Sequence, residues 1–169
     1  MVTSVPADIV RSIHVDRKKR IWVTTRNQGV VTLLDSLANL IGYLGPDGRL
    51  HPQPLLFAPV YCVAEQRNGT IWLGTQPSGL FRLKEAEEGT EAQVRTGEPI
   101  NCNDIYDIHE DRRGRLWIAT HGGGLNLLER SGGGMKFLNK DNTFKSYPAN
   151  NVFMRRLMIV GDTLILATT

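Results

Sequence analysis

The residues of this 169-residue chain that could bind a metal ion or act as nucleophiles include four histidines and two cysteines. Cys62 and Cys102 lack the short spacing of zinc ligands, so we predict unlinked thiols, with a disulfide as the alternative in an oxidising compartment. His14 and His109 have no carboxylate partner at a repeated spacing, which weakens the interpretation of a metal site. We therefore predict no metal site and no cofactor.

The serines and carboxylates do not form a catalytic pattern either. The sequence has no Gly-x-Ser-x-Gly, His-Glu-x-x-His or phosphate-loop motif. Asp16 and Asp111 stand at equivalent places in two predicted turns, where aspartate caps a hairpin. We therefore predict that the chain has no catalytic activity.

Polar residues in short loops could bind a ligand. Arg26, Gln76 and His121 each follow a predicted strand, in loops whose residues differ between copies of a repeated frame. Such loops commonly carry binding residues. The candidate ligand-binding residues on this loop face are Arg26, Asn27, Gln76, His121, Asn103 and Asn151. For each residue alone, turn formation is the competing interpretation.

Two predicted turns are basic, Arg17-Lys18-Lys19-Arg20 and Arg112-Arg113-Gly114-Arg115. They could form a face for phosphate or an anionic glycan. No aromatic residues alternate with them, as base stacking would require, and hairpin turns in solvent favour Lys and Arg. We interpret them as solvated turns and expect no nucleic-acid partner.

An internal repeat positions all of these residues, and the tryptophans reveal it. Trp22, Trp72 and Trp117 lie 50 and 45 residues apart, and aligning them superposes residues 9–34, 59–84 and 104–129 without a gap. Besides the tryptophan, three columns are identical. They hold a threonine (Thr25, Thr75, Thr120), a glycine (Gly29, Gly79, Gly124) and a leucine (Leu33, Leu83, Leu128).

Each copy is predicted to form a strand, a tight turn, a second strand, a short loop and a third strand. Short strands that recur every 45–50 residues are typical of β-propeller blades. The repeated tryptophan would fill the wedge between neighbouring blades, and the repeated glycine would allow the turn between the second and third strands. A fourth, outer strand is expected at 49–56, 92–96 and 143–147.

The predicted fold is all-β: a β-propeller fragment of about three and a half four-stranded blades. The whole chain, 1–169, forms one partial propeller, with blade repeats at about 9–58, 59–103 and 104–151 and a partial repeat at 152–169. In that partial copy, Ile165 replaces the tryptophan.

The composition agrees with an ordinary globular domain. Hydrophobic residues make up 41% and charged residues 22% of the chain, which excludes a mostly disordered protein. No apolar stretch approaches the roughly 20 residues of a membrane span, so no membrane contact is expected, and the N-terminus lacks the features of a signal peptide. The net charge of +3 is small for a dedicated nucleic-acid binder.

The segment from Ile108 to Asn126, Ile-His-Glu-Asp-Arg-Arg-Gly-Arg-Leu-Trp-Ile-Ala-Thr-His-Gly-Gly-Gly-Leu-Asn, resembles the two-component regulator propeller repeat. The segments Ile71-Trp-Leu-Gly-Thr and Ile21-Trp-Val-Thr-Thr resemble it as well. Streptogramin-lyase-like propellers use similar Asp…Gly…Trp hairpins. The sequence departs from the pattern at Lys19, which stands where the turn glycine belongs, and at Gln66, which replaces the turn aspartate.

The resemblance implies a seven-bladed propeller in the periplasmic sensor region of a bacterial hybrid histidine kinase, where it would recognise carbohydrate-type signals. An oligosaccharide is then the implied ligand. The remaining propeller blades, or a second copy of the chain, are the expected protein partners. The periplasmic location rests on this resemblance alone.

Two alternatives remain beside ligand sensing. One is a scaffolding propeller whose blade faces only pack against a second propeller. The other is a propeller lyase similar to streptogramin lyases, for which a His and a Glu should meet on the loop face near the propeller axis. We also expect an open arc to expose apolar blade surface at its ends, and hence to self-associate.

Overall fold

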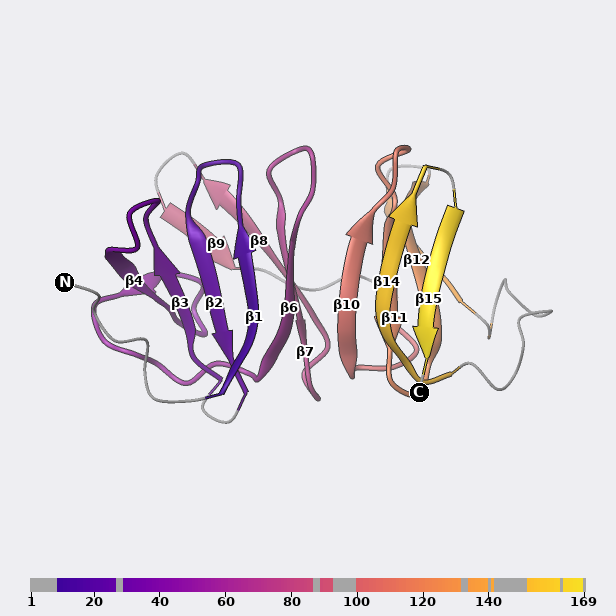
Figure 1. The fold of residues 1–169 in the computed structure, drawn as a ribbon, viewed down its shortest axis with the longest axis horizontal. Coiled ribbons are helices and arrows are strands. Elements are labelled where there is room, and N and C mark those ends of the chain that lie inside the picture. The colour runs from indigo at the N-terminus through magenta and orange to yellow at the C-terminus, as the bar shows by residue number, and fades with distance from the viewer. Residues whose placement is uncertain are drawn as a thin grey trace.

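The computed structural model describes residues 9–26, 29–86, 89–92, 100–131, 134–139, 141, 152–161 and 163–168. Within these residues the chain forms four antiparallel sheets that follow one another along the sequence (Figure 1). The all-β prediction is confirmed. We call the sheets blades 1 to 4.

Consecutive strands pair within each blade. Blade 1 contains β1 (Val10–Val15), β2 (Ile21–Thr25), β3 (Val31–Leu34), β4 (Leu40–Leu44) and β5 (Leu50–His51). Blade 2 contains β6 (Val60–Glu65), β7 (Ile71–Thr75), β8 (Leu80–Ala86) and β9 (Gly89–Ala92). Blade 3 contains β10 (Ile105–Glu110), β11 (Leu116–Thr120), β12 (Gly124–Ser131) and β13 (Gly134–Leu138). Blade 4 contains β14 (Met154–Val160) and β15 (Thr163–Thr168).

The outer strands differ from the prediction. In blade 1 the fourth strand is β4, and the expected 49–56 holds only the short fifth strand β5. In blade 2 the fourth strand is β9, which includes Ala92, whereas the rest of the expected strand, 93–96, lies outside the described residues. In blade 3 the fourth strand is β13, whereas 143–147 lies outside the described residues. These outer strands lack the tryptophan and glycine columns on which the prediction relied.

The tryptophans lie between blades, as predicted. Trp22 is buried in a cluster with Val63 and Leu73 of blade 2, and Trp72 is buried in a cluster with residues of blade 3 that include Ile108. Trp117 is half-buried and packs against Leu157 of blade 4. Burying an indole stabilises a fold by roughly 4–6 kcal/mol from area alone, so the core of this chain lies at the junctions between blades.

The first hairpin of blades 1 and 3 is closed by its aspartate. The Asp111 carboxylate accepts hydrogen bonds from the backbone N–H groups of Arg113 and Arg115 at 2.9 and 3.0 Å and from the indole Nε1–H of Trp117 at 3.0 Å. Asp16 does the same in blade 1, with the Trp22 indole at 2.9 Å. The interpretation of these aspartates as hairpin caps is therefore confirmed.

Two departures from the repeat pattern leave that geometry intact. In blade 2, the Gln66 side-chain oxygen accepts the Trp72 indole N–H at 2.8 Å in place of the aspartate. In blade 1, Lys19 takes the turn position with φ +63°, close to Gly69 (+83°) and Gly114 (+78°) in the other blades.

The loop between the second and third strands is one residue longer in blade 1 than in blades 2 and 3, so the gapless alignment is wrong beyond this loop in blade 1. The Thr75 and Thr120 hydroxyls donate to the carbonyls of Gly79 and Gly124, four residues on, whereas the Thr25 hydroxyl donates to Val30, five residues on. Blade 1 therefore carries one additional loop residue. In consequence, Val30 rather than Gly29 matches Gly79 and Gly124, and Leu34 rather than Leu33 matches Leu83 and Leu128.

Gly29 is nevertheless constrained. It has φ +59°, and a Cβ atom there would lie 2.7 Å from the Phe57 carbonyl oxygen. A side chain at this position would meet both backbone strain and a backbone atom. Gly29 therefore serves both the left-handed backbone of the loop between β2 and β3, as predicted, and the close passage of the linker at Phe57 and Ala58.

Every blade has a β-bulge near the start of its first strand. The pairing shifts between Val10 and Ser12, between Val60 and Cys62, between Ile105 and Asp107, and between Met154 and Arg156. The bulge leaves one residue of each first strand out of the register. Because blade 4 has it too, its two strands are a fourth copy of the repeat.

Both cysteines are free thiols, as predicted: Cys62 is buried and Cys102 is half-buried. Among the described residues, there is no helix with the length and apolar character needed to cross a membrane.

Candidate functional site

The bulged residues of the first strands form a row along one side of the sheets. The first strands of successive blades contact each other, so they line the inner side of the array. The bulged residues are Arg11, Tyr61, Tyr106 and Arg155 in blades 1 to 4. We call these four residues the inner row.

The inner row is held by ring and cation–π contacts. The Tyr61 and Tyr106 ring centroids are 4.8 Å apart. The Arg11 guanidinium lies 4.2 Å from the Tyr61 ring centroid and 5.5 Å from that of Tyr106. The Arg155 guanidinium lies 5.4 Å from the Tyr106 ring. Arginines from the two outermost blades thus flank two tyrosines at distances suited to cation–π attraction.

His121 extends this row towards the loop face. Its ring centroid lies 5.4 Å from that of Tyr106 and 4.7 Å from that of Phe153. His121 also pairs with Phe153 through a backbone bridge between blades 3 and 4. Phe153 is 43% exposed, so the aromatic surface remains accessible at this end.

The residues that follow the two tyrosines of the inner row, Cys62 and Asp107, are buried. Burial raises the pKa of the Cys62 thiol, and the nearby Asp107 carboxylate adds to the increase. A protonated buried thiol is a poor nucleophile. The buried Asp107 carboxylate accepts the Leu157 backbone N–H at 2.9 Å and thereby joins blades 3 and 4. These groups support the row structurally.

The loop residues predicted as ligand contacts occupy one repeated place. The backbone N–H groups of Arg26, Gln76 and His121 donate to the carbonyls of Ile9, Pro59 and Asp104, at the start of each blade. The structure therefore brings these three positions to the same edge of successive blades. Of the three, His121 has ring contacts with the aromatic cluster described above.

The other loop residues have more local surroundings. The Gln76 side-chain amide donates to the Asp104 carboxylate at 3.1 Å and so links blades 2 and 3. The Asn103 carbonyl accepts the Gly79 N–H at 3.1 Å, and its side-chain oxygen lies over Gly79. Arg26 is exposed. Asn27 and Asn151 lie outside the described residues, as does Asn150.

Asn101, grouped with these loop residues on sequence grounds, takes part in a polar network. Its side-chain N–H₂ donates to the Gly123 carbonyl at 2.9 Å and to Asp141 at 3.0 Å, and its oxygen accepts from the buried Asn126 at 2.9 Å. This network fastens the linker before blade 3 to the third strand of that blade, which is a structural role.

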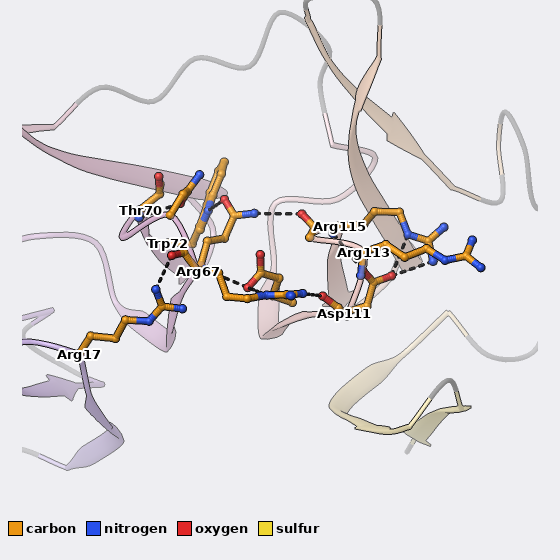
Figure 2. Close-up of polar contacts among 11 residues, drawn as sticks. Arg17, Arg67, Thr70, Trp72, Asp111, Arg113 and Arg115 are labelled. Atoms are coloured by element: carbon orange, nitrogen blue, oxygen red, sulfur yellow. Dashed lines mark hydrogen bonds and ion pairs between the residues drawn. The ribbon is translucent and has the colours of Figure 1, made fainter.

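The basic turns lie at the opposite ends of the first strands, and their arginines make specific contacts (Figure 2). The backbone N–H of Arg17 donates to Glu65 of blade 2 at 2.8 Å, and that of Arg67 donates to Glu110 of blade 3 at 2.9 Å. Arg20 and Arg115 pair with Asp16 and Asp111, each at 2.7 Å. Within the predicted basic turns, Arg17 joins two blades and Arg20 and Arg115 close hairpins, whereas Arg112 and Arg113 are exposed, as expected for solvated turns.

The histidines of the first strands lie opposite the tryptophans. His14 pairs with Trp22 and His109 with Trp117 in the strand register. Burial lowers the pKa of His14, against the opposing effect of Glu65 and Asp16. Within the described part of the chain, no three His, Cys, Asp or Glu side chains are grouped closely enough to hold a metal ion.

Sequence reasoning missed the inner row. Arg11, Tyr61 and Tyr106 do share one column of the repeat alignment, but the column mixes arginine with tyrosine and so does not look conserved between copies. The bulge that removes these residues from the strand register has no residue signature of its own. The available signal was the repetition of long arginine and tyrosine side chains at the position directly before the strand register resumes.

Comparison with known proteins adds to this geometry. Residues 54–76 and 99–122, in copies two and three of the repeat, match the family described as two component regulator propeller. No curated protein matches the sequence.

Three solved structures are similar in fold. The extracellular domain assigned to a hybrid two component system of B. thetaiotaomicron has a TM-score of 0.57 and 20% identity over 79% of this chain and 17% of that one. A catalytically inactive virginiamycin B lyase from Staphylococcus aureus has a TM-score of 0.62 and 15% identity over 98% of this chain and 52% of the other. A second virginiamycin B lyase structure from Staphylococcus aureus has a TM-score of 0.51 and 19% identity over 84% of this chain and 46% of the other.

This chain covers about half or less of each of these structures. At such identities the likeness establishes the fold. Together with the repeat match, it confirms both the β-propeller prediction and the family resemblance. The chain has the fold of a β-propeller fragment, and two of its repeats, at residues 54–76 and 99–122, match the two component regulator propeller family.

Proposed function

We propose that this chain is the ligand-recognition part of the extracytoplasmic, periplasmic sensor propeller of a bacterial hybrid histidine kinase. It binds a carbohydrate-type signal and catalyses no reaction. The observation that carries the proposal is the inner row with its neighbour His121: aromatic and cationic side chains of four successive blades converge within ring-contact distances.

The chemistry of this row suits a saccharide. The half-buried Tyr106 ring offers an apolar face against which the C–H face of a sugar can stack, and its hydroxyl group can exchange hydrogen bonds with sugar hydroxyls, whereas Tyr61 is buried behind it and supports the Tyr106 ring. Arg11 and Arg155 supply several N–H donors at the two sides of the row. Sugar binding of this kind needs no acid–base pair, in agreement with a sensor that does not alter its ligand.

The experiment is a calorimetric titration of the chain with a panel of neutral and acidic oligosaccharides. Tyr106→Leu with His121→Leu should weaken binding about tenfold or more, because stacked aromatic contacts contribute about 0.5–1.5 kcal/mol each beyond area burial. Arg26→Ala, on the same edge but without ring contacts to the row, is the matched control and should bind normally. Unchanged binding in the double variant would place recognition elsewhere.

Product analysis of the same mixtures separates sensing from the lyase alternative. Bound oligosaccharide should be recovered intact. The ring neighbours of His121, Tyr106 and Phe153, are aromatic and cannot serve as the acidic partner that a lyase mechanism would need. If no saccharide binds at all, the scaffolding alternative gains support.

A further inference from the structure

The blade junctions are closed by a repeated clamp, which we define as the first turn arginine of one blade and the final glutamate of the next blade's first strand. Arg17 holds Glu65, and Arg67 holds Glu110. In the second clamp, the Arg67 backbone N–H and its Nε–H both donate to one carboxylate oxygen of Glu110, at 2.9 and 3.3 Å. The Glu110 side chain is only 13% exposed.

Each clamp arginine also reaches a backbone carbonyl. The Arg17 guanidinium donates to the carbonyl of Arg67, and the Arg67 guanidinium donates to that of Asp111. Each clamp arginine thus donates hydrogen bonds both to a glutamate carboxylate and to a backbone carbonyl in the hairpin turn of the following blade. This double contact aligns successive hairpin turns.

The third junction keeps the arginine and lacks the carboxylate. In strand register, Glu65 and Glu110 lie opposite Ile71 and Leu116, and the equivalent residue of blade 4 is Ile159, opposite Leu164. Arg112 occupies the clamp position of blade 3. Within the described residues, neither its backbone N–H nor its guanidinium has a hydrogen-bond partner.

A pocket is present at the incomplete junction. It has a volume of about 160 Å³ and is lined by Asp111, Arg112, Arg113, Arg115, Trp117, Ile159 and Gly161. A smaller pocket of about 30 Å³ between blades 2 and 3 is lined by Gln66, Thr70, Trp72, Arg82, Gly114, Leu128 and Glu129, and this lining includes neither of the clamp residues Arg67 and Glu110. The larger pocket combines an apolar wall with the Arg112 and Arg113 guanidinium groups, for which the described part of the chain provides no hydrogen-bond partner.

The charges around this pocket favour an anion. Among the described residues of the lining, Asp111 is the acid, and its carboxylate already accepts bonds from Arg115 and Trp117. The remaining charged groups of the lining, Arg112 and Arg113, are exposed cations. A carboxylate is the group that the same arginine position binds in the other two junctions.

We propose that this pocket binds the side-chain carboxylate of a glutamate on an acidic segment of a partner protein, which completes the third clamp. The occupant's methylene groups would lie along Ile159 and Trp117, and its carboxylate would accept the backbone N–H and guanidinium of Arg112. The site lies at the turn ends of the strands, away from the loop-face end of the inner row, so it provides a protein contact separate from the proposed saccharide contact.

The test is an NMR titration of the ¹⁵N-labelled chain with the capped peptide acetyl-Gly-Glu-Gly-amide and, as control, its glutamine analogue. The glutamate peptide should shift the Arg112 amide resonance saturably, and the glutamine peptide should not. Arg112→Gln should weaken binding about tenfold, because hydrogen bonds to charged groups contribute about 1.5–3 kcal/mol.

Ile159→Glu supplies the missing carboxylate from within the chain and should abolish peptide binding, whereas Ile159→Gln, of equal shape and no charge, should retain it. Amide spectra of both variants report that they fold. Equal shifts with both peptides, or full binding by Ile159→Glu, would overturn the proposal. Saturation by inorganic phosphate at lower concentration than by the peptide would also overturn it, in favour of a free-anion site.

Discussion

At the scale of single residues, the turn aspartates perform several tasks with one side chain. The Asp111 carboxylate caps the turn, pairs with Arg115 and orients the Trp117 indole. Burial raises the pKa of Asp16 and Asp111, but hydrogen bonds from the tryptophan and arginine outweigh it, so both pKa values lie below the ordinary value. The ionised form is therefore the one that the folded chain favours.

The first prediction concerns acid stability. Because the folded-state pKa is lowered, the stabilisation from these aspartates is complete above the unfolded pKa, about 4, and is lost as the pH falls through the folded pKa. Asp16→Asn with Asp111→Asn should therefore destabilise the chain at pH 7 and flatten the fall in stability between pH 5 and pH 2. Urea unfolding across this range measures it. An unchanged acid dependence would contradict the assignment.

The second prediction is that Trp72 contributes more to the free energy of unfolding than Trp117 does. Trp72 is 1% exposed, whereas Trp117 is half-buried. Trp72→Ala should cost about 3–5 kcal/mol of unfolding free energy, and Trp117→Ala should cost clearly less. Denaturant unfolding of both variants gives the comparison, and equal losses would show that the junctions contribute alike.

At the scale of elements, the first three strands of each blade could be predicted because tryptophan, threonine and apolar columns mark them. Two features could not be predicted from the sequence. The extra residue in the loop of blade 1 was hidden because Gly29 and Leu33 happen to match neighbouring columns in sequence, and the true equivalents are Val30 and Leu34. The inner row escaped because it depends on a bulge, and packing between blades rather than residue type determines which side chains meet there.

The third prediction concerns the loop between the second and third strands. Gly79 has φ +84°, and an added Cβ would lie 3.0 Å from the Asn103 side-chain oxygen, whereas Gly69 has φ +83° with open space around it. Gly69→Ala should cost about 1–2 kcal/mol through backbone strain alone. Gly79→Ala should cost more, since the linker must also shift. Thermal unfolding of the two variants measures both losses of stability. Equal losses would show that the linker at Asn103 moves aside from the added Cβ at no cost in free energy.

At the scale of the whole molecule, the array leaves one face of blade 1 uncovered within the described structure. Ile13 is 65% exposed, whereas its repeat equivalents Val63 and Ile108, which face a preceding blade, are 8% and 4% exposed. Val15 is 57% exposed on the same strand. The face has the apolar side chains of a blade junction, and we propose that a further blade or a second copy of the chain covers it.

The fourth prediction tests this face. Ile13→Lys should reduce self-association of the chain without lowering its stability, because Ile13 is already exposed. Val63→Lys, at the equivalent position in a closed junction, should destabilise the fold by about 3 kcal/mol or more. Sedimentation velocity and urea unfolding measure the two effects. A wild-type chain that remains monomeric at high concentration would contradict a role for this face in pairing of copies.

The sequential packing of the blades has a consequence for how the molecule opens. Extensive contacts join each blade to its neighbours along the chain, so the free energy of unfolding divides into terms for single blades and terms for junctions, as in a one-dimensional chain of coupled units. Blades 2 and 3 each have two junctions, and blades 1 and 4 have one each among the described residues. Amide hydrogen exchange should therefore be slowest in β7 and β11 and should quicken towards both ends, a gradient of protection that follows the order of the sequence itself.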